Sequence, residues 1–347
     1  MKKVIFVISI MVLVAGICFS QTGRDFTTAI NGSRNGVIIT GYRGSVTHVD
    51  IPAEIEGLPV TEISRRAFRR NNNIVSITIP GTATIIGAEA FAGCRSLTSV
   101  TMPNSVTEIG ESLFEGSGRI TNVILSESLT SIPTGTFKDC SSLVSVNIPS
   151  SVRSFGESVL EGCESLVSIT LPPAIRVIPA RMFYGATRLA EVNLNEGLTR
   201  RGEMAFVDTK GLVRLNLPNS LTHIDDVAFM NSGLTEIIFP NSMLRIGAVS
   251  FSGSNVGKVQ FPNHNNFTLG ALAFAGCRNL TSVTIPENVT NIIFEQGITV
   301  RQHGAITDAI GLVARPTLQN AGSFFRGGRL DLASQAALMR VGYRWDF

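Results

Sequence analysis

The cysteine residues offer the most varied chemistry in this sequence, since a thiol can be a nucleophile, a metal ligand or half of a disulfide. Apart from Cys18, the cysteines are Cys94, Cys140, Cys163 and Cys277, each three residues after a regularly spaced phenylalanine or leucine. This shared position indicates an inward-facing slot that suits a small apolar thiol. Only Cys140 and Cys163 are one 23-residue spacing apart, so a disulfide between them stays sterically feasible. We expect free, buried thiols.

Histidine chemistry depends on nearby carboxylates, and one such group occurs. His223, Asp225 and Asp226 have the residue types of a metal or acid–base cluster. His223, however, occupies the same position in its repeat as Glu62 and Glu108, which favours a solvated side chain. The sequence contains no metal-type Cys/His spacing, nucleophile elbow, Walker loop or dinucleotide fingerprint. We therefore predict no catalytic residue, no cofactor and no metal.

One basic cluster stands out, formed by Arg65, Arg66, Arg69 and Arg70 and followed by Asn71-Asn72-Asn73. Such a cluster can meet anionic glycans, lipopolysaccharide or an acidic partner. The simpler interpretation, which we prefer, is a solvated turn at the start of a repeat.

The element that positions all these side chains is an internal repeat. Phenylalanine recurs every 23 residues, and one position in the series is filled by leucine instead. A later phenylalanine comes one residue early, after which the spacing resumes. The series is Phe68, Phe91, Phe114, Phe137, Leu160, Phe183, Phe206, Phe229, Phe251 and Phe274. These ten units predict a solenoid, in which each 23-residue coil buries its apolar face against the next.

Each unit also carries a strand pattern. The segment Leu97-Thr-Ser-Val100-Thr-Met102-Pro103 alternates apolar and polar residues with period two, as a half-buried strand does. Proline ends the strand because it cannot donate the next hydrogen bond, although Ser126 and Asn195 replace it in two units. We expect the strands to form one continuous parallel sheet, with the phenylalanines inside the coils.

The pattern LxxLxLPxxLxxIxxxAFxxC, here beginning at Leu97 and reaching Phe114, resembles the treponemal-type (BspA-like) leucine-rich repeat. The segments 41–44 and 57–63 are similar to that family's opening, and the resemblance covers residues 37–290. It implies an α/β-type repeat solenoid with 23-residue units, a parallel β-sheet on the concave face and a cap at each end.

The first 20 residues predict export. Two lysines and an apolar run from Val4 to Ile17 precede small residues, as in a secretory signal peptide cut after Ser20. Lipidation at Cys18 is the alternative, although Ile17 stands where lipoproteins usually carry a small residue. The predicted division is then signal peptide 1–20, N-terminal cap 21–59, solenoid 60–290 and C-terminal cap 291–347. Within the last segment, Leu330–Met339 has helical spacing.

The outward side chains of the predicted strands are the main candidates for partner binding. Small hydroxyl and amide side chains dominate the first units, charges follow in the later ones, and two isoleucines interrupt the polar columns. The candidates are Ser99, Asn122, Ile124, Ser145, Asn147, Ser168, Thr170, Glu191, Asn193, Arg214, Asn216, Glu236, Ile238 and Lys258. For any single residue, the alternative is that a water-facing sheet simply needs polar side chains. As a whole, such a face is typical of recognition.

Net charge and composition argue against several classes of partner. Removal of residues 1–20 takes two lysines from the 29 Lys+Arg, so 27 − 26 leaves a net charge of +1. Neither nucleic acid nor an anionic membrane is favoured as a partner, and no segment after the first 20 residues is long and apolar enough to span a membrane.

We predict an exported, non-catalytic protein- or glycan-binding module, at the cell surface or secreted. The resemblance implies an adhesin-like role toward a protein or glycoprotein of host matrix or cell surfaces, because family members have been linked to fibronectin and fibrinogen. The alternative is a periplasmic or envelope scaffold with an endogenous partner. A secreted hydrolase is the third hypothesis.

Overall fold

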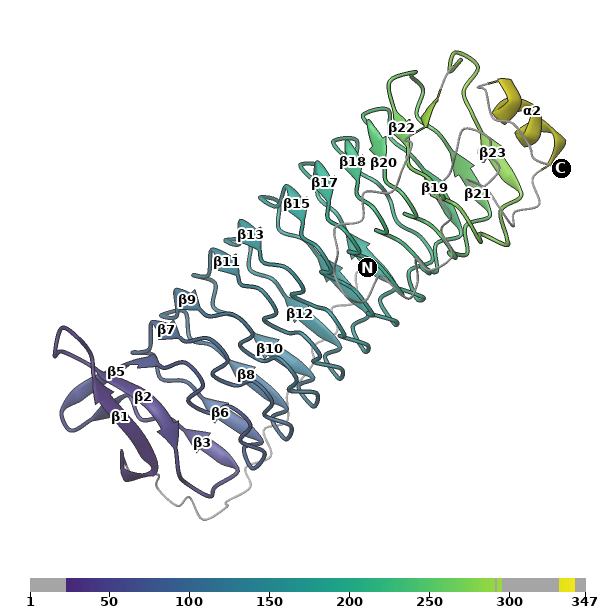
Figure 1. The fold of residues 1–347 in the computed structure, drawn as a ribbon. Coiled ribbons are helices and arrows are strands. Elements are labelled where there is room, and N and C mark those ends of the chain that lie inside the picture. The colour runs from purple at the N-terminus through teal and green to yellow at the C-terminus, as the bar shows by residue number, and fades with distance from the viewer. Residues whose placement is uncertain (1–22, 291, 295–330, 341–347) are drawn as a thin grey trace, which may run out of the picture.

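The chain forms one elongated stack of coils in a computed structural model that describes residues 23–290, 292–294 and 331–340 (Figure 1). About eleven turns follow one another at intervals of about 23 residues. The predicted repeat solenoid is confirmed. The predicted signal peptide 1–20 and the lipidation site Cys18 lie outside the described residues.

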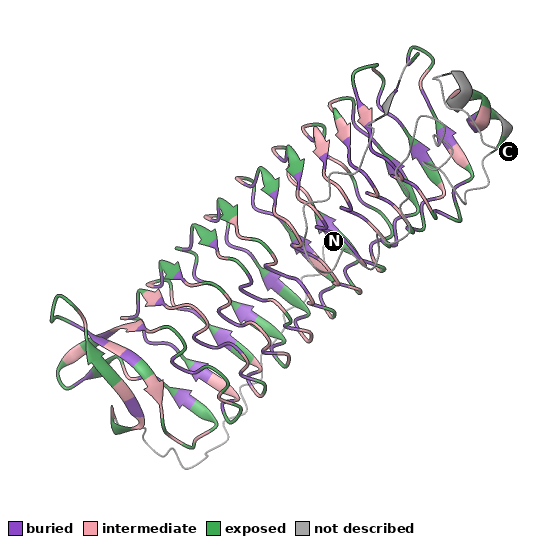
Figure 2. Ribbon diagram, in the orientation of Figure 1, coloured by how far each residue is buried: buried purple, intermediate pink, exposed green. Residues whose placement is uncertain are grey.

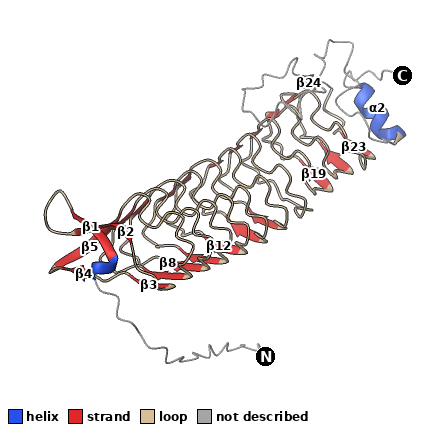
Figure 3. Cartoon of the chain, turned by 60° about the horizontal axis from the view of Figure 1, so that its bottom comes forward, coloured by secondary structure: helices blue, strands red, loops and turns tan. Residues whose placement is uncertain are grey.

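Three-residue strands run along one side of the stack and pair in parallel with their neighbours (Figure 3). The central residue of each points inward and the flanking two point outward, as the period-two pattern predicts. We call this side the long-strand face. Its strands are β3 (His48–Asp50), β6 (Ser76–Thr78), β8 (Ser99–Thr101), β10 (Asn122–Ile124), β12 (Ser145–Asn147), β14 (Ser168–Thr170), β16 (Glu191–Asn193), β19 (Glu236–Ile238), β21 (Lys258–Gln260) and β23 (Ser282–Thr284).

A second set of parallel strands, mostly two residues long, forms the next side of each coil. After β5 (Leu58–Ile63), these are β7 (Ile85–Ile86), β9 (Glu108–Ile109), β11 (Ser131–Ile132), β13 (Ser154–Phe155), β15 (Val177–Ile178), β17 (Arg200–Arg201), β18 (His223–Ile224), β20 (Arg245–Ile246), β22 (Thr268–Leu269) and β24 (Ile293–Phe294). We call this the short-strand side.

The third side of each coil is a tight turn, and residues 26–290 contain no helix. Two residues in each turn adopt the left-handed conformation. One lies two positions before the phenylalanine, as at Glu89 (φ 57°), and the other lies two positions after it, as at Gly93 (φ 69°). The amides of these two residues and of the phenylalanine donate to the next coil, for example Phe91 N to Leu113 O at 3.0 Å. Glycine fills the second left-handed position in six coils because it has no Cβ to clash.

The core is a ladder of stacked rings. Phe91 and Phe114 lie 5.7 Å apart between centroids with their planes at 13°, and the side chains are fully buried. Burial of each ring contributes about 1.5–3 kcal/mol. Leu160 breaks the ladder, and next to it both strand ladders lapse, because β12 does not pair with β14 and β13 does not pair with β15.

The prediction of one continuous sheet is therefore wrong. The long-strand face divides into separate sheets, β3 to β12, β14 with β16, and β19 to β23. Residues 213–217, where a strand is expected, form none.

Both ends of the stack carry added elements. After η1 (Gly23–Asp25), β1 (Phe26–Ile30) lies antiparallel to β2 (Val37–Tyr42), which pairs with β5. A short β4 (Glu54–Ile55) also pairs with β5. At the other end, α2 (Leu332–Arg340) lies beside β23 (Figure 3), close to the helix expected at 330–339.

Hydrogen bonds join α2 to the edge of β23. The Val283 amide donates to the Ser334 hydroxyl at 2.7 Å, and the Asp331 amide donates to the Thr281 carbonyl at 2.9 Å. The helix thus satisfies edge groups that would otherwise invite another strand. The cap boundaries at 59 and 291 stay predictions. Within the described ranges, no helix has the length and apolar character that crossing a membrane requires.

Candidate functional site

The predicted binding residues form aligned outward columns on the long-strand face. Register pairs Asn122 with Ser99 on one side and Ser145 on the other. Ile124 and Ile238 are 52% and 54% exposed. Figure 2 shows the alternation along these strands, with a buried central residue between more exposed ones.

A groove divides this face where the sheet is interrupted. On one side is β16, which pairs with β14 and with no strand beyond it. On the other is the segment 213–217, whose only backbone hydrogen bond among the described residues runs from Thr235 N to Val213 O at 3.1 Å. The groove has a volume of about 570 Å³. Its lining includes four of the predicted binding residues, Glu191, Asn193, Arg214 and Asn216.

Two leucines of the groove lining are more open than their counterparts in other coils. Leu194 and Leu217 are only partly buried, whereas the equivalent Leu171 and Phe239 in other coils are each 3% exposed. The opening between the two coils therefore uncovers side chains that the intact sheet hides.

Charged and amide groups line the walls of the groove. Glu191 and Glu196 lie at the β16 side and Arg214 at the other. The Asn193 amide donates to Glu191 at 2.9 Å and to Thr170 at 3.3 Å, which fixes that wall. The groove thus offers an acidic wall, a basic wall and backbone groups that pair with no strand within the described ranges.

A buried arginine lies between the same two coils. Arg201 is 0% exposed, and none of its three guanidinium nitrogens has a hydrogen-bond partner among the described residues. Its guanidinium carbon lies 5.2 Å from the Phe206 ring centroid and 4.8 Å from that of Phe229. Burial lowers the pKa of Arg201 to about 9. Sequence reasoning missed this residue, although isoleucine in the matching positions 178 and 224 marks an arginine there as out of place.

The basic cluster lies on exposed turns, and three of its arginines share one carboxylate. Arg65, Arg66 and Arg69 lie 3.0, 2.7 and 3.1 Å from the Glu89 carboxylate oxygens. The hydrogen bond from Arg66, more than any other contact, lowers the pKa of Glu89 to about 2. The solvated-turn interpretation describes the position of the cluster but not this convergence.

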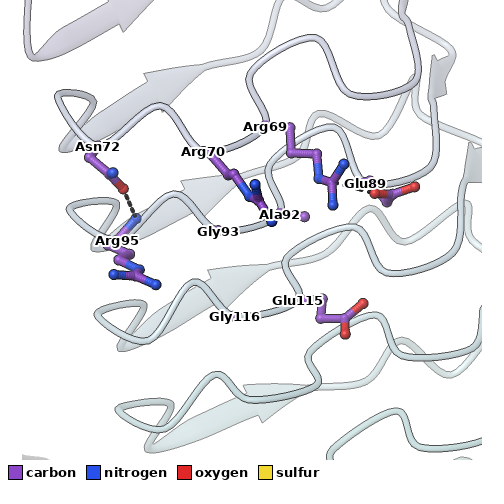
Figure 4. Close-up of a pocket in the computed structure, with 9 residues that line it drawn as sticks. All are labelled: Arg69, Arg70, Asn72, Glu89, Ala92, Gly93, Arg95, Glu115 and Gly116. Atoms are coloured by element: carbon purple, nitrogen blue, oxygen red, sulfur yellow. Dashed lines mark hydrogen bonds and ion pairs between the residues drawn. The ribbon is translucent and has the colours of Figure 1, made fainter.

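Beside Glu89 is a hollow of about 630 Å³ on the turns (Figure 4). Arg70 and Arg95 line it, together with Arg69, Asn72 and Glu115 and the small residues of the turns. Neither Arg70 nor Arg95 forms an ion pair within the part of the chain that the structure describes.

The histidine group does not assemble into a site. Asp225 pairs with Arg200 at 3.0 Å and Asp226 with Arg245 at 2.7 Å, while His223 Nδ1 lies 2.8 Å from the Thr222 hydroxyl. Each carboxylate is thus engaged by an arginine of a neighbouring coil. No set of three or more His, Cys, Asp or Glu side chains converges in the described ranges.

The four described cysteines are free and buried, so the free-thiol prediction is confirmed and Cys140 and Cys163 form no disulfide. Each thiol lies near the carbonyl oxygen of the phenylalanine one coil earlier, as with Cys163 Sγ and Phe137 O at 3.2 Å. Burial raises the pKa of Cys94 to about 12 and of Cys277 to about 11. These thiols are therefore protonated and structural.

Coils of about 23 residues with a strand on one face and a buried phenylalanine ladder define the leucine-rich repeat class of solenoids. The chain belongs to the BspA-type leucine-rich repeat family, because the model of that repeat region, with six copies, matches residues 61–189 and 176–296. None of the curated proteins matches the chain.

Two solved structures illustrate the similarity. The leucine-rich repeat protein of T. pallidum is 30% identical, with 55% of this chain and 90% of that one covered and a TM-score of 0.54. A leucine-rich repeat protein from Bacteroides ovatus is 25% identical, with 78% of this chain and 77% of that one covered and a TM-score of 0.70.

Proposed function

We propose that this chain is an exported, non-catalytic protein that binds a protein or glycoprotein ligand on its long-strand face, centred on the groove between β16 and residues 213–217. The interrupted sheet carries this proposal. It uncovers apolar side chains and unpaired backbone groups among residues that the sequence already marks as binding candidates.

The groove favours an extended segment of the partner. An extended chain presents N–H and C=O groups along its length, and those groups complement the unpaired edges of a strand. Leu194 and Leu217 would receive alternate apolar side chains of that segment, while Glu191 and Arg214 would select charges at its ends. The neighbouring columns of small polar residues would then provide a broad, modest contact.

Export and an adhesin-like role rest on sequence features. Residues 1–20 have the composition of a signal peptide, and the family resemblance suggests host matrix or cell-surface partners. A periplasmic or envelope scaffold is the second candidate function. Protease added to intact cells would digest a surface protein and spare a periplasmic one. For a hydrolase, the described residues offer no converging catalytic group.

The experiment is a binding screen followed by groove-blocking variants. The purified protein would be tested against immobilised matrix proteins and glycoproteins. For each captured ligand, the double variant Asn193→Trp/Asn216→Trp would fill the groove. Thr78→Trp/Thr101→Trp is the matched control, since both residues are exposed in the same outward column on β6 and β8, which pair with each other, and neither is a predicted binding residue.

We expect the double variant to weaken capture at least tenfold, a loss of about 1.4 kcal/mol, and the control to retain it. Equal loss of capture in both variants would mean that the contact extends over the whole long-strand face. Full binding by both variants would place the contact elsewhere. Silence across the screen, with the protein folded, would favour an endogenous envelope partner.

A further inference from the structure

The turns of the first coils carry more arginine side chains than the carboxylates beside them can neutralise. Arg65, Arg66 and Arg69 all point at Glu89, the one carboxylate among the described residues that their side chains contact. One negative charge cannot balance three positive ones, and the arginine side chains stay 64%, 48% and 35% exposed. Two positive charges therefore remain for an external anion.

Two more guanidinium groups extend this charge. Arg70 and Arg95 come from consecutive turns and line the hollow next to Glu89 (Figure 4). Their backbones are ordered by the repeat, because the Arg95 amide donates to the Asn72 side chain at 3.1 Å. A Cβ on Gly93 would lie 3.1 Å from the Arg70 Cγ, so the glycine leaves room for the arginine stem.

The arrangement favours a chain with several anions over a single ion. Beyond the three arginines that share Glu89, Arg70 and Arg95 place further guanidinium groups on two consecutive turns, so the positive charge extends along the stack. Guanidinium groups bind sulfate and phosphate oxygens in a bidentate manner. Glu89 and Glu115 between the arginines would repel a uniformly anionic surface, but they accept hydrogen bonds from neutral hydroxyls.

The lining also argues against a lipid surface. Apart from Ala92 and glycine backbone, it consists of charged and amide residues, with no large apolar side chain to enter a bilayer. A sulfated polysaccharide alternates sulfate groups with sugar hydroxyls, which matches guanidinium groups interspersed with carboxylates. The geometry points to a sulfated polysaccharide as the ligand of this hollow, at a site on the turns that is separate from the groove on the long-strand face.

The test uses immobilised heparin and the purified full chain, with binding measured by surface plasmon resonance at about 0.15 M NaCl, where weak surface charge effects are screened. The variant Arg70→Asn/Arg95→Gln removes two charges, and asparagine suits position 70 because Asn231 adopts the same left-handed conformation in a later coil. Arg153→Gln/Arg188→Gln is the matched control, since both residues are exposed and belong to later coils that do not line the hollow.

We expect the site variant to bind heparin about tenfold more weakly, from the loss of two charge-assisted contacts, and the control to bind as the native chain does. Arg95→Gln alone, on an exposed side chain, should lose about threefold and keeps the test valid if the double variant unfolds. Fully desulfated heparin should not compete.

Three results would overturn the inference. Unchanged affinity in the site variant would remove these arginines from the contact. Equal competition by desulfated heparin would show that the site does not recognise the sulfate groups. Stronger binding to phosphatidylglycerol vesicles or to polyglutamate, lost in the same variant, would assign the hollow to a membrane or an acidic protein. Because none of these uses a groove ligand, they leave the proposed function untouched.

Discussion

The guanidinium of Arg201 lies 4.8 Å above the ring of Phe229, one coil further along the chain, and has no hydrogen-bond acceptor among the described residues. The ring face offers some attraction to the cation. It does not replace the water that a buried guanidinium loses, so the charge costs folding free energy of several kcal/mol. The cost falls on the two coils between which the long-strand sheet opens.

Replacing Arg201 with isoleucine should stabilise the protein. Isoleucine occupies the matching positions 178 and 224 on either side, so the variant Arg201→Ile completes an apolar column. We expect a gain of about 1–4 kcal/mol, as when other buried charges are replaced by apolar residues. Urea unfolding followed by circular dichroism measures it. Arg200→Ile, on the exposed neighbour, should give no such gain, and an unstable Arg201→Ile would mean that the charge has a partner.

The stability difference between Arg201→Ile and the native chain should shrink at high pH. Burial lowers the pKa of Arg201 in the folded chain well below its usual value, to about 9. Below pH 9 both folded and unfolded states are protonated, and the full penalty applies. Above about pH 9 the folded state loses its proton before the unfolded state does, so the native chain gains relative stability, at most about 1.4 kcal/mol per pH unit. Urea midpoints at pH 7 and 10 would reveal it, and a constant difference would contradict the pKa shift.

The buried cysteines should resist thiol reagents. Burial holds the pKa of Cys94 near 12 and of Cys277 near 11, and all four described thiols are inaccessible, so little thiolate forms at pH 8. We expect reaction with a disulfide reagent such as Ellman's to be at least about a hundredfold slower in the folded chain than in urea. Rapid reaction of two or more thiols in the folded chain would show that the coils open locally.

Two glycines should respond very differently to alanine. A Cβ on Gly110 would overlap the backbone of Ala88 in the preceding coil, whereas a Cβ on Gly81 would meet nothing within 4 Å. Gly110→Ala must therefore push two coils apart, and we expect a loss of about 1–3 kcal/mol. Gly81→Ala should be neutral. Thermal unfolding of both variants gives the comparison, and similar melting temperatures would mean that the coils adapt without cost.

Releasing the arginines from Glu89 should strengthen heparin binding. Glu89→Gln keeps the shape of the side chain and removes the charge that three arginines share. We expect severalfold tighter binding, with the effect reduced by salt because the contact is electrostatic. The same surface plasmon resonance assay measures it. Weaker binding would indicate that Glu89 orients the arginines more than it neutralises them.

The repeat was predictable from the sequence because its causes are local and recur. A phenylalanine every 23 residues and a period-two strand leave few ways to bury the apolar side chains other than stacking. The inward slot of Cys140 and the outward slot of His223 followed from the same spacing. The tight turns were not predicted, although glycines such as Gly93 and Gly116 recur two residues after the phenylalanine, where the backbone is left-handed.

The groove was not predictable because it is a property of two coils together. Arg214 and Asn216 occupy ordinary outward positions, and Val213 fits a strand, so period-two reasoning expects pairing there. Whether neighbouring strands pair depends on how their coils pack, which the pattern of one unit does not contain. Arg201 was a visible departure in its column, and its burial became evident only with the fold.

The gap in the ring ladder at Leu160 has a mechanical consequence. The hydrogen bonds between coils lie along the stack, so a force pulling the two ends loads every boundary in series, and the weakest one sets the strength of the whole. Next to Leu160, ring stacking and both strand ladders lapse together. We expect a chain under load to open at this boundary before the boundaries on either side, with turn hydrogen bonds such as Leu160 N to Met182 O at 3.0 Å as the contacts that still hold it.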